Sequence, residues 1–173
     1  HLVLVATTDV HGHTTEWDYA ADRPFPGGLT RVATVIDSLK TRYPGRLIVV
    51  DAGDLIQGDL FAAYYGRVAP RDPHPAIDAM NAIGYDVATP GNHDFDYGVS
   101  VLQRAVASAT FRYISGNIRG LPGDTLEFAP YVVIVRAGIR IGITGFTTPG
   151  VMVWDQKALR GRTRVAPIRQ SAA

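Results

Sequence analysis

The chain of 173 residues contains no cysteine, so disulfide bonds, cysteine nucleophiles and thiolate metal sites are excluded. Its formal net charge of +1 creates no field that would attract nucleic acid or an anionic membrane. No apolar run approaches the roughly 20 residues that a membrane-spanning helix needs. Hydrophobic residues make up 46% of the chain, which is ordinary for a folded protein. We therefore expect one domain with a core, and neither a nucleic-acid duplex nor a membrane as partner.

Glutamate is also scarce, with two residues against fourteen aspartates. Glutamate suits helix surfaces, whereas aspartate suits turns, helix caps and metal sites. Many of these aspartates lie in segments that we expect to be loops. Whether these aspartates are turn residues or metal ligands therefore depends on where the loops lie in the fold.

Buried, β-rich segments alternate with helical patterns along the chain. The expected strands are Leu2–Thr8 (buried on both faces), Arg46–Asp54, Tyr85–Pro90 and Phe111–Ile118. The expected helices are Leu29–Tyr43, Gln57–Gly66, Pro75–Gly84 and Val99–Ser108. The alternating segment Tyr131–Phe146 indicates a β-hairpin. This order predicts an α/β domain with a mainly parallel sheet and a C-terminal hairpin.

The last segment, "ALRGRTRVAPIRQSAA", carries four arginines. Such a basic segment could be an arm that binds nucleic acid. We favour an exposed loop that leads into a helix beginning at Pro167, because proline is common at the first position of a helix.

Three polar clusters follow three of the expected strands: "TTDVHGH" (Thr7–His13), "DAGD" (Asp51–Asp54) and "GNHDFD" (Gly91–Asp96). The carboxyl ends of neighbouring parallel strands meet at one crevice, which is where open α/β sheets bind ligands. Six candidate site residues should therefore lie close together: Asp9, His11, Asp54, Asn92, His93 and Asp96.

These residue types suit a divalent metal ion. Carboxylate oxygen, amide oxygen and imidazole nitrogen bind Mn, Fe, Zn, Ni or Co in preference to softer ions. Asp9 and His11 are two residues apart, so both side chains can reach one ion from the same face of an extended segment. Asp54 has two oxygens and could bridge two ions. Gly53 and Gly91 allow tight turns and a close approach of backbone to ligand.

Each of these residues also has an ordinary explanation when it is taken alone. An aspartate at a strand end is usually a cap or turn residue, and a single histidine is usually a surface residue. We assign structural roles to four neighbouring polar residues: His13, His74, Asp51 and Asp94, the last as a cap or a solvent-facing residue. The functional interpretation rests on D-x-H, G-D and G-N-H-D in this order, each after a strand.

The motifs "TTDVHG", "DAGDLIQG" and "TPGNHDFDYG" resemble those of the calcineurin-like metallophosphoesterases. Within that family the chain is similar to two exported bacterial groups, the 5′-nucleotidases and the 2′,3′-cyclic-nucleotide 2′-phosphodiesterase/3′-nucleotidases. The segments "WDYA", "HPAIDAMNAIGYD" and "TTPGVMVWDQKALRG" favour the cyclic phosphodiesterases, whereas Asp96 favours the 5′-nucleotidases. The resemblance extends over essentially all 173 residues. It implies hydrolysis of a nucleotide phosphoester in the periplasm or at the cell wall; the composition itself fits any compartment, including the cytoplasm.

The same resemblance assigns roles to the six candidates. It implies that Asp9, His11 and Asp54 hold the first of two divalent ions, and that Asp54 and Asn92 bind the second. It implies that His93 is no ligand but stabilises the transition state or protonates the leaving oxygen, and that Asp96 orients it. An imidazolium beside a carboxylate is a suitable acid near neutral pH.

The family pattern contains further parts. Members fold as a four-layer αββα sandwich, complete the metal centre with later histidines, and carry a C-terminal nucleotide-binding domain. No histidine follows His93 in this chain. We therefore expect residues 1–173 to be an incomplete catalytic domain that is inactive alone, with its exposed sheet face covered by the missing C-terminal half or by a second copy. The alternative is a non-catalytic α/β fragment that binds metal or phosphate and acts as an assembly module.

Overall fold

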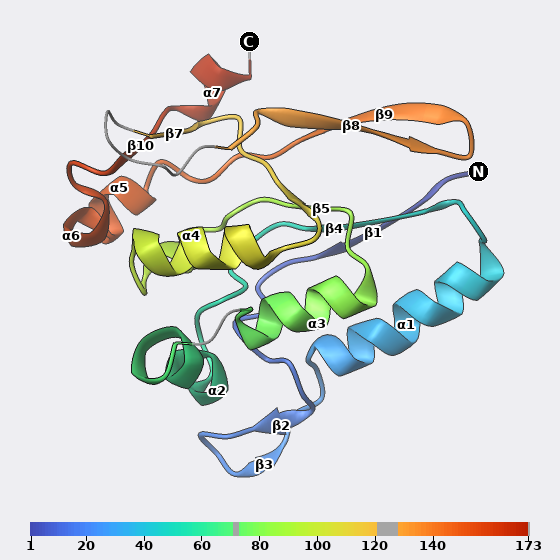
Figure 1. The fold of residues 1–173 in the computed structure, drawn as a ribbon, viewed down its shortest axis with the longest axis horizontal. Helices are drawn as coiled ribbons and strands as arrows, with labels where there is room; N and C mark the ends of the chain where they lie inside the picture. Colours follow the sequence, from blue (N-terminus) through green and yellow to red (C-terminus); the bar gives the residue numbers. More distant parts are fainter. Residues whose placement is uncertain (71–72, 121–127, 173) are drawn as a thin grey trace.

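The computed structural model describes residues 1–70, 73–120 and 128–172 (Figure 1). Its central sheet has four strands in the order β1-β4-β5-β6, and every neighbouring pair is parallel. The strands are β1 (Val3–Thr7), β4 (Leu47–Asp51), β5 (Val87–Ala88) and β6 (Arg112–Tyr113). The predicted α/β class with a mainly parallel sheet is therefore confirmed.

Helices cover one side of this sheet (Figure 1). They are α1 (Leu29–Arg42), α3 (Pro75–Ile83) and α4 (Val99–Ser108), and all three were predicted within a residue or two. α3 has proline at its first position and ends at Gly84, which adopts the left-handed conformation expected of a helix-ending glycine. The short helix α2 (Leu60–Ala63) continues into one π-helical turn, η1 (Tyr64–Val68). A small ladder of β2 (Trp17–Asp18) and β3 (Arg23–Pro24) lies within the segment before α1.

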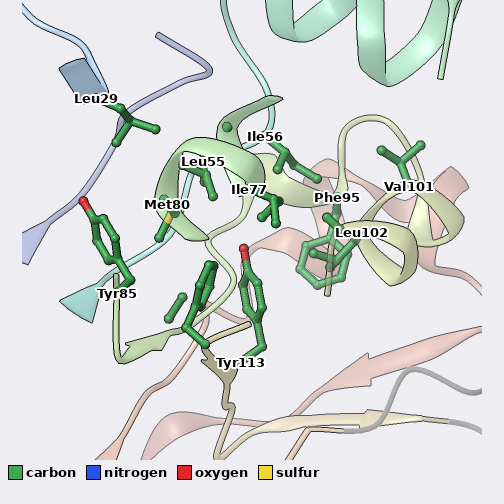
Figure 2. Close-up of a cluster of buried hydrophobic side chains, with 14 of the residues drawn as sticks. Leu29, Leu55, Ile56, Ile77, Met80, Tyr85, Phe95, Val101, Leu102 and Tyr113 are labelled. Atoms are coloured by element: carbon green, nitrogen blue, oxygen red, sulfur yellow. The ribbon is translucent and has the colours of Figure 1, made fainter. Parts of the chain in front are cut away.

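The core lies between the helices and the sheet, and Figure 2 shows its centre. Ile77 and Met80 of α3 are fully buried there. They pack in one cluster with Leu55, Ile56 and Phe95, which belong to the loops after β4 and β5. Burying a side chain of this size stabilises a fold by roughly 1.5–3 kcal/mol. These loops are therefore anchored in the core, and the polar residues beside them have fixed positions.

The hairpin of β8 (Tyr131–Arg136) and β9 (Ile139–Thr144) lies on the other side of the sheet, as Figure 1 shows. Arg136 fastens it to the sheet, because its Nε donates to the carbonyl of Leu47 at 2.9 Å and its guanidinium pairs with Asp86. The predicted hairpin is thus confirmed. No helix among the described residues is both long enough and apolar enough to cross a membrane.

The prediction that the first strand is buried on both faces is wrong. Burial alternates along β1, and the Leu4 side chain is 64% exposed. The reason is that no part of the described chain covers this face at Leu4. Further along the sheet, a cleft of about 370 Å³ lies between β4, β5 and β9. Its walls include Val50, Val87 and Ile143.

The C-terminal region also differs from the expected exposed loop. β10 (Thr163–Val165) pairs antiparallel with β7 (Ile118–Gly120), and both Thr163 and Val165 are buried. The predicted single strand Phe111–Ile118 therefore divides into β6 and β7. Two short helices, α5 (Val151–Trp154) and α6 (Gln156–Leu159), precede β10. The last helix, α7 (Ile168–Ser171), begins directly after Pro167, as predicted.

Candidate metal centre

The loops after β1 and β4 are joined by backbone hydrogen bonds. The N–H of Asp9 donates to Gly53 O at 3.0 Å, and the N–H of His11 donates to Asp54 O at 2.8 Å. A third bond of 2.8 Å joins Gly12 N–H to Leu55 O. Because Leu55 is anchored in the core, this pairing places the D-x-H and G-D motifs side by side at one end of the sheet.

Three of the predicted residues converge there. Asp9, His11 and Asp54 each offer one ligand atom, and these atoms all lie within 4.8 Å of one another. The His11 ring is oriented by Gln57, whose backbone carbonyl oxygen lies 3.1 Å from Nδ1. A carbonyl can only accept, so Nδ1 carries a proton, and in the neutral ring Nε2 is the atom with the lone pair. Nε2 is the atom that faces Asp9, at 3.9 Å from its Oδ1. Two carboxylates and a correctly protonated imidazole fit a divalent ion.

The same three residues have unusual backbone conformations. The φ angles of Asp9, His11 and Asp54 are 54°, 49° and 59°. Left-handed conformations cost most non-glycine residues roughly 1–2 kcal/mol each, and less for Asp, whose short polar side chain can hydrogen-bond locally. Strain of this kind concentrates at functional sites, where the surrounding structure enforces it.

The loop after β5 meets the loop after β4 at two glycines. A side chain on Gly53 would overlap the backbone of Gly91, and one on Gly91 would overlap the carboxylate of Asp54. The two loops therefore touch backbone to backbone, which only glycine permits. This contact lets Asp54 Oδ1 accept the backbone N–H of His93 at 2.8 Å.

The side chain of Asp94 joins the loop after β4 to the loop after β5 by hydrogen bonds. Its side chain is buried and accepts four backbone N–H groups at 2.8–3.0 Å, from Asp54, Leu55, Ile56 and Gly91. Burial raises the pKa of Asp94, and the bonds from Ile56, Gly91 and Leu55 oppose that rise. Asp94 was expected either to cap backbone N–H groups or to face solvent, and the second of these expectations is wrong because the side chain is buried. Asp94 is an internal acceptor that holds the candidate ligand Asp54 in place.

His93 and Asp96 form a pair on the outer side of the same loop. His93 is the first residue of the 3₁₀ turn η2 (His93–Phe95) and Asp96 follows its last residue, and side chains three residues apart in such a turn lie on one side. His93 Nδ1 is 3.0 Å from Asp96 Oδ2, and this hydrogen bond raises the pKa of His93. The His93 ring lies 5.3 Å from the His11 ring, measured between centroids. An imidazole that favours its protonated form therefore stands beside the three-residue cluster.

Asn92 is the remaining predicted residue. It lines a pocket of about 500 Å³ together with His93 and Asp96. Two further residues of that pocket, Trp154 and Asp155, come from the end of α5 and were absent from our candidates. Burial and the nearby charge of Asp96 raise the pKa of Asp155. In the sequence these two residues lie in the segment "TTPGVMVWDQKALRG", whose similarity to the cyclic phosphodiesterases is the only signal that marks them.

The neighbouring polar residues have structural surroundings. His13 stacks on Phe25 with ring centroids 4.2 Å apart, and its Nδ1 lies 3.6 Å from an oxygen of Asp59. Asp51 is buried under the loops, where it accepts Thr7 Oγ1–H at 2.6 Å and the Gly53 N–H at 2.9 Å. Burial raises the pKa of Asp51 to about 7.

Comparison with known proteins identifies the family of this chain. Residues 2–170 match the family described as calcineurin-like phosphoesterase. The chain is 36% identical over 183 residues to a 2′,3′-cyclic-nucleotide 2′-phosphodiesterase/3′-nucleotidase of Haemophilus influenzae. It is 34% identical over 188 residues to the trifunctional nucleotide phosphoesterase protein YfkN of Bacillus subtilis. The crystal structure of calcineurin-like phosphoesterase YfkN superposes with a TM-score of 0.89 at 33% identity.

These similarities cover nearly all of this chain but only part of the relatives. The matches include 99% of this chain, yet 28% of the H. influenzae protein and 13% of the B. subtilis protein. The YfkN structure is matched over 55% of its chain. The chain thus spans less than a third of the length of the two relatives.

Proposed function

Because the chain belongs to the calcineurin-like phosphoesterase family, we propose that it forms part of a metal-dependent hydrolase of nucleotide phosphoesters. The names of both relatives support a nucleotide as substrate. One observation carries the proposal for this chain. The ligand atoms of Asp9, His11 and Asp54 lie within 4.8 Å of one another, beside the His93–Asp96 pair.

In the proposed site, Asp9, His11 and Asp54 hold one divalent ion. Asp54 and Asn92 contribute to a second. Two bound ions supply a more acidic water and neutralise the charge that develops on the phosphoryl oxygens. The chain's own part is to fix the ligands: Gln57 orients His11, and Asp94 holds the backbone of Asp54.

His93 acts on the substrate in this proposal, with Asp96 as its positioning residue. Its Nδ1 is engaged by Asp96, so Nε2 is the atom left to donate a proton to the phosphoryl or leaving oxygen. The hydrogen bond keeps the imidazole protonated to a higher pH than usual, because the pKa of His93 is raised. Such an acid fits catalysis near neutral pH.

We propose that the described residues hold part of a two-ion centre and that the rest of the parent protein completes it. They offer a single group of three or more His, Asp or Glu side chains close enough for one ion. The same observation favours a second candidate function for these 173 residues alone, a fragment that binds one metal ion without turnover. Calorimetric titration of the 173-residue chain with Mn²⁺ tests how many ions these residues hold: we expect at most one weak site per chain, and two tight sites would contradict the proposed ligand sets.

Two variants test the assignment of the first ion. His11→Asn should abolish Mn²⁺ binding, whereas His13→Asn should retain it, because His13 stacks on Phe25 and is not one of the three converging residues. Equal Mn²⁺ affinity in wild type and His11→Asn would contradict the proposed ligand set. This pair is closely matched, since the two histidines are only two residues apart.

The role of His93 needs the complete parent protein. There His93→Asn should lower the rate of hydrolysis of a 2′,3′-cyclic nucleotide or of AMP by roughly 10²–10⁴-fold. Metal content should remain that of the wild type, because His93 is proposed to be no ligand. Loss of an ion in metal analysis would show that this role is wrong. Faster hydrolysis of the 2′,3′-cyclic nucleotide would indicate that the parent acts like the cyclic phosphodiesterases, and faster hydrolysis of AMP that it acts like the 5′-nucleotidases.

A further inference from the structure

Asp155 reaches the pocket of His93 from a distant part of the chain. It lies at the junction of α5 and α6, and it lines the pocket of about 500 Å³ together with Asn92, His93 and Asp96. The proposed metal ligands and the His93–Asp96 pair leave its carboxyl group without a role in the site.

The Asp155 side chain does not perform the structural task that its position offers. Asp155 is the N-cap of α6, where an aspartate side chain usually accepts a backbone N–H of the first turn. Within the described residues of this turn no such side-chain bond is present, and only the backbone carbonyl of Asp155 accepts, from Ala158 and Leu159. Asp59, in contrast, caps α2 in the usual way by accepting the N–H of Ala62 at 2.9 Å. The Asp155 carboxyl is therefore available for another contact.

That contact is with Asp96. A side-chain hydrogen bond joins the two carboxyl groups, and Oδ2 of Asp96 also lies 3.0 Å from Nδ1 of His93. Two carboxyl groups can share a hydrogen bond only if one of them carries the proton. Burial and the charge of Asp96 raise the pKa of Asp155, so we assign the proton to Asp155. Asp96 then accepts from Asp155 and from His93, which its two oxygens allow.

We propose that Asp155 is a positioning residue, which holds Asp96 in the orientation that directs His93 toward the substrate. The inference rests on the proposed function for the role of His93. The side chains of His93 and Asp96 are 45% and 27% exposed, and a pair this open to solvent is weakly restrained by its own contact. Asp155 restrains Asp96 from a second direction. Its own position is fixed because Val151 of α5 and Leu159 of α6 are fully buried.

Kinetics of the complete parent protein separate this role from a direct contact with substrate. Asp155→Ala should lower kcat for AMP or a 2′,3′-cyclic nucleotide by about tenfold to a hundredfold, the usual effect of losing a partner that orients a functional group. KM and metal content should stay close to those of the wild type. Asp155→Asn should retain most of the rate, because its NH₂ group can donate to Asp96 as the carboxyl O–H does. A raised KM with an unchanged kcat would indicate a substrate contact and would overturn the proposal.

The other alternative is that Asp155 only orders the junction of α5 and α6. Gln156 is a matched control, because it is the next residue, is exposed and does not line the pocket. Gln156→Ala should leave kcat unchanged, and equal losses in Gln156→Ala and Asp155→Ala would overturn the proposal. A double-mutant cycle adds a second criterion. In an Asp96→Ala background, Asp155→Ala should cause little further loss of kcat, whereas the same fold-loss in both backgrounds would show that Asp155 does not act through Asp96.

Carboxyl ¹³C NMR of the parent protein gives a readout that does not depend on turnover. The pKa of Asp155 should be raised in the wild type and lower in Asp96→Ala, because the contact with Asp96 is one of the causes that raise it. Equal values in the two proteins would overturn the proposal, even if the parent hydrolysed nucleotides normally. A parent that hydrolysed neither nucleotide would refute the proposed function, while the NMR difference would still support the hydrogen bond by which Asp155 holds Asp96.

Discussion

Asp94→Asn should destabilise the fold strongly, although it is the mildest possible change in shape. Oδ1 of Asp94 accepts the N–H groups of Leu55 and Ile56, and Oδ2 accepts those of Asp54 and Gly91. An asparagine keeps one oxygen and replaces the other with an NH₂ group, which only donates. Whichever way the amide turns, two of the four N–H groups lose their acceptor.

The size of the effect follows from that count. A buried N–H without an acceptor costs about 1–3 kcal/mol, so two of them cost about 2–6 kcal/mol. Domains of ordinary stability unfold with about 5–15 kcal/mol. Asp94→Asn should therefore remove a large fraction of the free energy of unfolding. It should also loosen Asp54, whose backbone N–H is one of the four donors.

Urea unfolding followed by circular dichroism measures this loss. A matched control is Asp37→Asn, because the Asp37 side chain is 75% exposed and forms only a 3.8 Å contact with Lys40. The control should change the free energy of unfolding by less than about 0.5 kcal/mol. If Asp94→Asn changed the free energy of unfolding by as little as the control does, the hydrogen bonds from the four N–H groups to the carboxylate would not stabilise the fold. Asp94 would then not be the residue that holds these loops together.

Three further predictions concern single residues. The pKa of Asp51 is raised from 3.8 to about 7, so between these pH values the folded state binds more protons than the unfolded state, and stability falls as the pH rises. In urea unfolding at pH 4–8, Asp51→Asn should remove up to about 4 kcal/mol of this pH dependence of stability. Asp96→Asn should lower the pKa of His93, because the hydrogen bond to Asp96 is the main cause that raises it. NMR titrations of the His93 ring that gave the same pKa in the variant and the wild type would contradict this cause. Gly91→Ala should displace Asp54 and weaken Mn²⁺ binding in calorimetry, whereas Gly142→Ala, which meets nothing within 4 Å, should not.

The parallel sheet could be predicted because its signals are local and mutually consistent. Apolar runs mark the strands, and residues such as Pro75 and Gly84 mark where α3 begins and ends. β10 could not be found this way. β10 has only three residues, Thr163–Val165, which is too short to show the alternation of buried and exposed residues that marks a strand. It is a strand because it pairs with β7. Tertiary pairing decides such a short segment.

The candidate site was predictable only in its chemistry. Residue types and their order after three strands were enough to select Asp9, His11 and Asp54. The same reasoning could not separate Asp94 from Asp96, because both lie in one motif two residues apart. The 3₁₀ turn makes the difference, turning Asp96 toward His93 and Asp94 into the core. Trp154 and Asp155 reach the pocket through the fold alone, because they are about sixty residues further along the chain.

The three converging residues break the local rules of backbone conformation, and this shows how the centre is maintained. Asp9, His11 and Asp54 all have positive φ, at a combined cost of at most roughly 3–6 kcal/mol, because Asp and His adopt this conformation more readily than other residues. The backbone bonds from Asp9 to Gly53 and from His11 to Asp54 oppose that cost, as do the four bonds to Asp94. At about 1 kcal/mol each, with more for bonds to a charged group, six such bonds are sufficient to offset the strain. The backbone conformations that bring the three ligand atoms together are therefore imposed by hydrogen bonds within and between the loops.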